Sequence, residues 1–153
     1  MADTVTALSH WQFAMSGLLH FLFIPLTLGV SLLLLIIESI QMAGARHDLQ
    51  PLADVLERVF KLAFVMAIAT RLPIVLQFGA NGSYFSHYAG DAFALPLALV
   101  GLSSLFLAAL VFGPYSSDWA RSSRKRHWLL TGLLVLAMHL SAFWIVLSHS
   151  WMQ

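Results

Sequence analysis

The stretch FLFIPLTLGVSLLLLII, residues 21–37, contains no ionisable side chain. It lies inside an apolar run from about Phe13 to Met42 that only His20 and Glu38 interrupt. A helix needs about 20 predominantly apolar residues to cross the ~30 Å hydrocarbon core of a bilayer. The run is therefore long enough to span a membrane, and we predict a transmembrane helix over it.

Three further apolar runs follow along the chain. They cover about Leu62–Phe78, Ala92–Ser117 and Trp128–Met152. The first of these three reaches the required length only when Arg58–Lys61 form an interfacial first turn. The sequence therefore predicts an all-α integral membrane protein, a four-transmembrane-helix bundle that forms a single domain over residues 1–153.

The composition excludes a soluble domain. Of the 153 residues, 59% are hydrophobic and 10% are charged, whereas soluble domains carry about 25% charged residues. A soluble fold of this size could not hide so much apolar surface. The net charge of +1 provides no field that would recruit nucleic acid, so we expect no nucleic acid partner. Because cysteine is absent, disulfides, iron–sulfur ligation and a c-type haem attachment are excluded.

Lysine and arginine predict the orientation of the bundle. Basic residues surround the first and third connections, while the second connection, Ala80–Asp91, has none. Under the positive-inside rule, both termini and Ala80–Asp91 face the outer side, with Trp11 and Trp151 at the outer interface. Met1–Gln12 lacks the basic stretch of a secretory signal, so no cleaved leader is expected. The basic residues that set this orientation are Arg46, Arg58, Lys61, Arg121, Arg124, Lys125 and Arg126.

Two histidines lie within the predicted spans at similar depth. His20 comes nine residues after Trp11 and His139 twelve residues before Trp151, which is roughly 13 and 18 Å below the outer interface. Because the first and fourth helices are antiparallel, the two rings can face one another, as the iron of a tetrapyrrole requires. The alternative is that each imidazole bonds a backbone carbonyl between helices.

Other ionisable groups also lie close to or inside the predicted spans. His10 and His149 repeat the antiparallel relation nearer the surface, but ten residues rotate a helix some 80° short of whole turns, so they need not share a face with the inner pair. Arg71 cannot deprotonate and needs an anion, either a haem propionate, a quinone oxygen or a carboxylate of a neighbouring subunit. Glu38 lies near the inner end of its helix, where it is expected to reach water.

Three segments carry a resemblance to a known family. They are Gln12–Gly29 (QFAMSGLLHFLFIPLTLG), Gln77–Ala98 (QFGANGSYFSHYAGDAFALPLA) and Leu140–Gln153 (LSAFWIVLSHSWMQ). Together they resemble the start of subunit I of the cytochrome bd quinol oxidases, whose pattern is close to QFAL…HFLFVPLTLG, QFGTNWSYYSHYVGD…APLA and LSALW…GWMQ. The resemblance covers almost the whole chain, and about the first four of that subunit's nine helices.

The resemblance implies roles for several residues and a location. His20 matches the family histidine that ligates one of the haems at the active centre, and His127 matches a histidine near the cytoplasmic face. The location implied is the bacterial inner (cytoplasmic) membrane, so that the outer side is the periplasmic side. The loop Gly79–Asp91 matches a segment packed over the active centre, with Ser83, Tyr84, His87 and Asp91 in it.

Departures from the family pattern fall where oxygen chemistry needs support. Two glutamates of the family's third helix, one in the haem pocket and one in a proton path, are Val100 and Ala108 here. Arg71 replaces a small residue, and His139 and His149 stand where well-known sequences have asparagine. The family's low-spin haem ligands, its quinol-binding loop and the glutamate ligand of its third haem lie beyond Gln153.

The resulting hypothesis is a membrane b-type cytochrome. We expect haem b between His20 and His139, with a second haem as an alternative. Arg71 would contact a propionate, His149 is the alternative second ligand, and His10 is the outermost candidate. Two axial imidazoles leave no vacancy for oxygen on the iron.

The expected role is electron transfer within a respiratory membrane complex, to or from quinone. The expected partners are the lipid bilayer and either other membrane subunits or a second short chain of the same kind. Such a chain is an electron-transfer subunit rather than an oxidase by itself. Two alternatives stay open, namely a split quinol oxidase that still handles oxygen at His20 and a haem-free membrane anchor.

Overall fold

The computed structural model describes residues 2–44, 47–80, 109–117 and 123–151. Three long helices and one short turn account for most of this part of the chain, and residues 109–117 are also helical. The prediction of an all-helical protein is confirmed over these ranges. The elements are α1 (Ala2–Met42), the 3-10 turn η1 (His47–Leu49), α2 (Gln50–Ala80) and α4 (Arg124–Trp151).

Two segments, Thr4–Met42 and Arg124–Leu147, are long and apolar enough to cross a membrane by length and composition. α2 is long enough as well, but Arg58, Lys61 and Arg71 lower its apolar character. The predicted third span, Ala92–Ser117, lies mostly outside the described residues. The four-span bundle and its orientation therefore stay predictions.

The local sequence explains both ends of α1 and the start of α4. Residues 2–12 contain neither glycine nor proline, so α1 begins well before the apolar run predicted from Phe13. It ends ahead of Gly44, whose φ of 77° is typical of the residue that terminates a helix. At the start of α4, the Ser123 hydroxyl accepts the Arg126 N–H at 3.4 Å, which is an N-cap contact.

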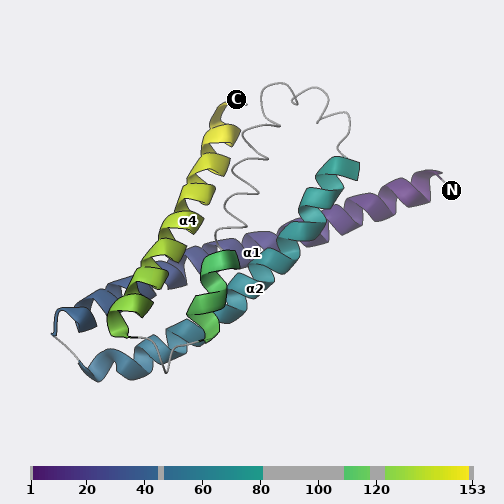
Figure 1. The fold of residues 1–153 in the computed structure, drawn as a ribbon. Coiled ribbons are helices and arrows are strands. Elements are labelled where there is room, and N and C mark those ends of the chain that lie inside the picture. The colour runs from purple at the N-terminus through teal and green to yellow at the C-terminus, as the bar shows by residue number, and fades with distance from the viewer. Residues whose placement is uncertain (1, 45–46, 81–108, 118–122, 152–153) are drawn as a thin grey trace.

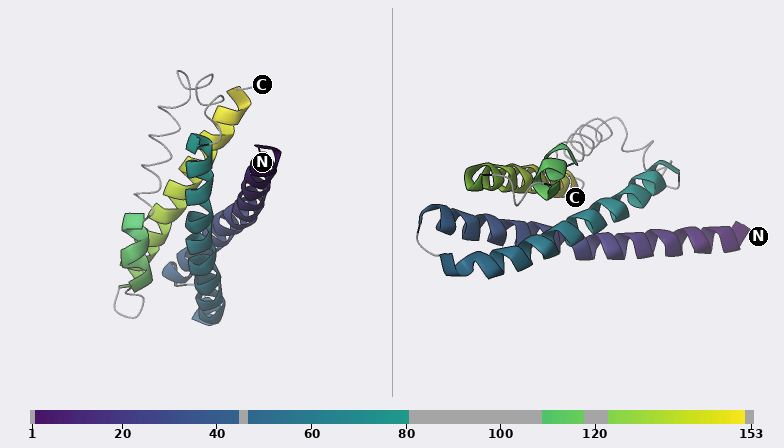
Figure 2. Two further views of the ribbon diagram at one scale, coloured as in Figure 1. Left: turned by 90° about the vertical axis from the view of Figure 1, so that its right-hand side faces the viewer. Right: turned by 60° about the horizontal axis from the view of Figure 1, so that its bottom comes forward.

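The helices meet at one end of the molecule, where α1 ends and α2 and α4 begin. We call this the basic end, because Arg58, Lys61 and residues 124–126 lie there. α1 packs antiparallel against α2 and, on another side, against α4. Figures 1 and 2 show that α1 and α4 lie close together near the basic end and diverge toward the two termini.

The buried core lies toward the basic end and is rich in aromatic rings. Phe64 of α2 stacks on Phe112 at 4.3 Å between ring centroids, and Phe60 meets Tyr115 edge-on at 5.6 Å. The helix over residues 109–117 thus joins the core through α2. Large apolar side chains along the N-terminal half of α1 are exposed instead, as expected of a surface that faces lipid or further protein.

Candidate functional site

His20 faces α2 and is held there by a threonine. Its Nδ1 lies 3.1 Å from Thr70 Oγ1. The Thr70 hydroxyl is also 2.8 Å from the carbonyl oxygen of Met66 and 3.1 Å from that of Ala67. Carbonyl oxygens only accept hydrogen bonds, so the hydroxyl proton points to them and Thr70 Oγ1 is left to accept from His20. The His20 ring therefore carries a proton on Nδ1, and in its neutral form the lone pair is on Nε2.

Arg71 follows Thr70 on α2 and lies close enough for its charge to act on the His20 ring. The side chain is half-buried. The structure thus brings together two of the residues expected at the site, His20 from α1 and Arg71 from α2. An imidazole and a guanidinium in the same part of the bundle are one candidate metal ligand and one positive charge.

His139 of α4 has the same protonation pattern but a different partner. Its Nδ1 lies 2.8 Å from the carbonyl oxygen of Val135, one turn earlier in the same helix. Because that oxygen only accepts, Nδ1 carries the proton and Nε2 carries the lone pair. No hydrogen bond among the described residues joins the His139 ring to His20.

The register of α1 against α4 gives a level for each histidine. Counting one residue of α4 for each residue of α1, His20 falls level with residues 145–147. His139 lies six to eight residues short of that level, roughly 9–12 Å, and His149 lies two to four residues past it, roughly 3–6 Å. The contacts that define the register join Glu38 to His127, Ser39 to Trp128 and Leu35 to Gly132.

This register differs from the similar depth expected for His20 and His139. That expectation placed Trp11 and Trp151 at the same level. The residue count instead places Trp11 further from the basic end than Trp151. The backbone of His149 belongs to α4, and its side chain is outside the described residues. His10 is exposed on α1. The assignment of the second ligand stays a prediction.

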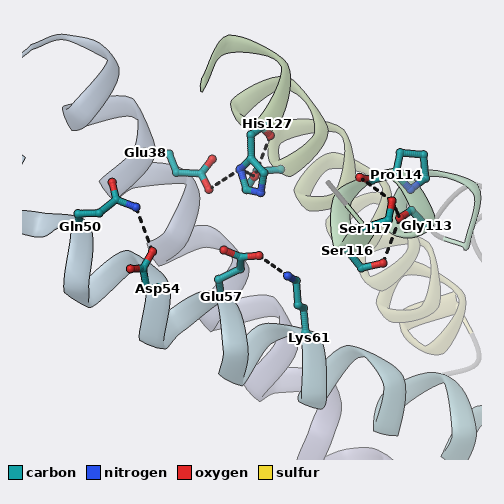
Figure 3. Close-up of polar contacts among 11 residues, drawn as sticks. Glu38, Gln50, Asp54, Glu57, Lys61, Gly113, Pro114, Ser116, Ser117 and His127 are labelled. Atoms are coloured by element: carbon teal, nitrogen blue, oxygen red, sulfur yellow. Dashed lines mark hydrogen bonds and ion pairs between the residues drawn. The ribbon is translucent and has the colours of Figure 1, made fainter. Parts of the chain in front are cut away.

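A second group of polar side chains lies at the basic end, away from His20. Glu38 Oε1 of α1 is 3.1 Å from His127 Nδ1 of α4, and the two residues are each only 4% exposed. The expectation that Glu38 reaches water is wrong. α1 continues for another turn to Met42, so Glu38 lies inside the helix end and faces α4, as Figure 3 shows.

Other helices close around this pair. The Tyr115 ring is fully buried and lies 4.7 Å from the His127 ring between centroids. On α2, Glu57 forms an ion pair with Lys61, and Lys61 Nζ lies 5.6 Å from the centre of the Tyr115 ring. Buried polar and charged groups from four helical segments therefore meet at the basic end.

Sequence reasoning missed this second group. The available signal was positional, since Glu38 and His127 each lie within about one turn of the helix ends that form the basic end. Several other predicted positions lie outside the described residues, so their placement is not known. They are Ser83, Tyr84, His87 and Asp91 of the loop after α2, together with Val100 and Ala108.

Comparison with known proteins identifies the family. The model of cytochrome bd terminal oxidase subunit I matches residues 8–153. The chain is 39% identical over 149 residues to cytochrome bd-II ubiquinol oxidase subunit 1 of Escherichia coli (strain K12), which covers 97% of this chain and 29% of that protein. It is 30% identical over 146 residues to cytochrome bd ubiquinol oxidase subunit 1 of Bacillus subtilis (strain 168), with 95% and 31% covered.

The protein is thus a membrane protein related to respiratory oxidases. More particularly, the chain belongs to the cytochrome bd terminal oxidase subunit I family, as its three sequence segments predicted. Members of this family are inner-membrane proteins of bacteria. The chain spans about three tenths of the length of the curated relatives that it matches.

Proposed function

We propose that this chain binds haem b through His20 and transfers electrons within a respiratory complex of the bacterial inner membrane. The observation that carries the proposal is the tautomer of His20. Its Nδ1–H donates to Thr70, so Nε2 is the ring nitrogen that would ligate iron. Ligating histidines usually donate their second ring nitrogen to an oxygen in this way, because the bond fixes the ring and raises its basicity.

The residues present fit a haem at His20. Bound there, the haem would supply a centre that accepts and donates single electrons. His20 would hold the iron, Thr70 would orient the imidazole, and Arg71 would neutralise a propionate or another anion. The charge of Arg71 would also favour haem binding. A propionate buried in the bundle is unfavourable unless a positive charge compensates it.

The second axial ligand would come from α4. His139 has a lone pair on Nε2, which supports it as a ligand, whereas the register supports His149, which is closer to the level of His20. Either residue would make the iron six-coordinate and low-spin. Because α1 and α4 diverge toward their termini, the haem would lie between them where they separate.

The proposed topology has four spans, with the basic end in the cytoplasm and both termini on the periplasmic side. The basic residues of the two connections at that end support it through the positive-inside rule. Other membrane subunits or a second copy of a short chain would cover the exposed apolar face of α1. Quinone is the proposed electron donor or acceptor of the complex.

One alternative function has a specific observation in its favour. Both relatives are named as ubiquinol oxidase subunits, so this chain could form part of a split oxidase in which oxygen reacts at His20. In that case the iron needs an open position and would be five-coordinate and high-spin.

A reduced-minus-oxidised spectrum of the complex isolated from its membrane tests the proposal, with haem type and amount determined as the pyridine haemochrome. We expect one low-spin b haem per chain. A high-spin centre that binds carbon monoxide favours the oxidase alternative. Absence of haem from the complex contradicts both and leaves the membrane anchor.

Thr70→Val is expected to weaken haem retention about 10- to 100-fold, because the orienting partner of His20 is lost while the ligand stays. The measurement is haem transfer from the isolated complex to an excess of apo-myoglobin. The matched control is Thr27→Val, since the Thr27 hydroxyl is also buried and bonds only its own helix, at Phe23 O. Equal retention in the two variants would show that Thr70 does not act on the ligand.

A further inference from the structure

Glu38 and His127 form a buried pair that the proposed haem site does not use. Each residue is 4% exposed, and Glu38 Oε1 lies 3.1 Å from His127 Nδ1. Among the described residues, His127 is the one group within bonding distance of the Glu38 carboxylate. The pair joins α1 to α4, eighteen residues along α1 from His20, which is roughly 27 Å.

A proton must be shared within this pair. An ionised carboxylate in an apolar interior is several kcal/mol unfavourable without a compensating positive charge, and a neutral imidazole does not supply one. Either His127 is protonated and pairs with the Glu38 anion, or Glu38 is protonated and bonds neutral His127. Both arrangements hold one dissociable proton between Glu38 and His127.

Among the described residues, the charges around the pair do not replace that proton. Lys61 is already paired with Glu57 on α2, so those two side chains together add no net charge. Tyr115, from residues 109–117, is a buried phenol near enough to Glu57 and Glu38 for their charges to act on it, and it is itself neutral. Thr131 of α4 contributes a hydroxyl that bonds the His127 carbonyl at 3.1 Å. With the shared proton the group is neutral, and without it the group carries one negative charge.

Tyr115 and Lys61 lie between the pair and an open depression at the basic end. An open depression of about 270 Å³ is lined by Asp54, Glu57, Arg58 and Lys61. Lys61 is 30% exposed and lies over the Tyr115 ring, which in turn lies against His127. The buried Tyr115 hydroxyl has no hydrogen-bond partner among the residues that the structure describes, so it is available to a water molecule or a passing proton.

We propose that Glu38 and His127 form a proton-binding site that exchanges one proton with water at the basic end, through Tyr115 and the Glu57–Lys61 pair. On release, the O–H or N–H bond of the pair breaks, its electron pair stays on that atom, and a water molecule takes the proton. Uptake reverses these steps. The proposal does not require haem and therefore stands apart from the proposed function.

The test is infrared difference spectroscopy on the full chain in lipid vesicles, between mildly acidic and mildly alkaline buffer. We expect the pair to release one proton per chain in addition to the protons of other histidines such as His10, seen as loss of a carboxylic acid or imidazolium band. Glu38→Gln and, independently, His127→Gln are each expected to remove this signal. Asp48→Asn is the control, because Asp48 is an exposed carboxylate at the same end, and it should leave the signal unchanged.

The route is tested by the rate of the same signal after a pH jump. Tyr115→Phe and Glu57→Gln are expected to slow it about tenfold or more while its final amplitude stays near that of the native chain. Circular dichroism confirms that each variant retains its helices. A native chain whose Glu38 and His127 bands do not change with pH would overturn the proposal, since the pair would then be a fixed structural contact. Unchanged rates in both route variants would overturn the assigned path.

Discussion

His20→Ala is expected to abolish the b-type haem spectrum of the isolated complex. The substitution removes the proposed iron ligand from α1, the side chain that bonds Thr70 of α2. Loss of an axial histidine removes the bond that positions the iron, so we expect at least about 90% of the haem to be lost on purification. Haem content per chain, measured as the pyridine haemochrome, gives the result directly.

The matched control is His10→Ala. His10 lies on the same helix but is exposed, ten residues before His20. This variant should retain the native haem content and spectrum. If instead His20→Ala retained a full complement of low-spin haem, the proposed ligand would be wrong even though the family membership would stand.

Substitutions on α4 separate the two candidates for the second ligand. If His139 ligates the iron, His139→Ala converts the low-spin spectrum to a high-spin one, and His149→Ala leaves it low-spin. The register of α1 against α4 at the basic end favours His149 as the ligand instead. In that case His149→Ala gives the high-spin spectrum and His139→Ala leaves it low-spin. A low-spin spectrum in both variants would exclude the pairing of His20 with either histidine.

The sequence was sufficient to predict that the described residues are helical. The apolar run up to Met42 predicted the end of α1, because Gly44 follows it and terminates the helix. The start of α1 at Ala2 could not be predicted from hydropathy. Residues 2–12 precede the apolar run, and α1 extends through them without a break. The start of the helix therefore differs from the start of the apolar run.

The candidate site could be predicted only in part. The resemblance identified His20, but neither composition nor spacing indicated that Thr70 would fix its tautomer, since this depends on the register of α1 against α2. Depth estimates identified Glu38 as close to water, because depth alone does not say which neighbour a side chain faces. Rotation about the helix axis, set by packing of Leu34, Phe60 and Leu134, turns Glu38 toward His127 instead.

Breaking the Glu38–His127 pair is expected to destabilise the bundle more than breaking a neutral contact between the same helices. Glu38→Leu or His127→Leu leaves the other group buried without its partner, which costs about 3–5 kcal/mol in comparable buried pairs. The free energy of unfolding, measured in mixed detergent micelles by helical circular dichroism, should fall by that amount in each variant. Ser39→Ala is the control, because it removes the neighbouring 2.9 Å hydrogen bond from Trp128 and should cost about 0.5–1.5 kcal/mol.

The double variant shows how much of this loss of stability comes from the partner that each single substitution leaves buried and unpaired. If the cost of each single substitution comes mainly from the partner left behind, replacing both residues by leucine removes that cost, because no buried charge remains. We therefore expect the double variant to be more stable than either single variant, with a coupling free energy of about 2 kcal/mol or more. Additive losses would mean that the two side chains do not interact in the folded protein. A double variant that is stable but lacks the proton release of the pair would show that the pair serves proton exchange rather than the stability of the fold.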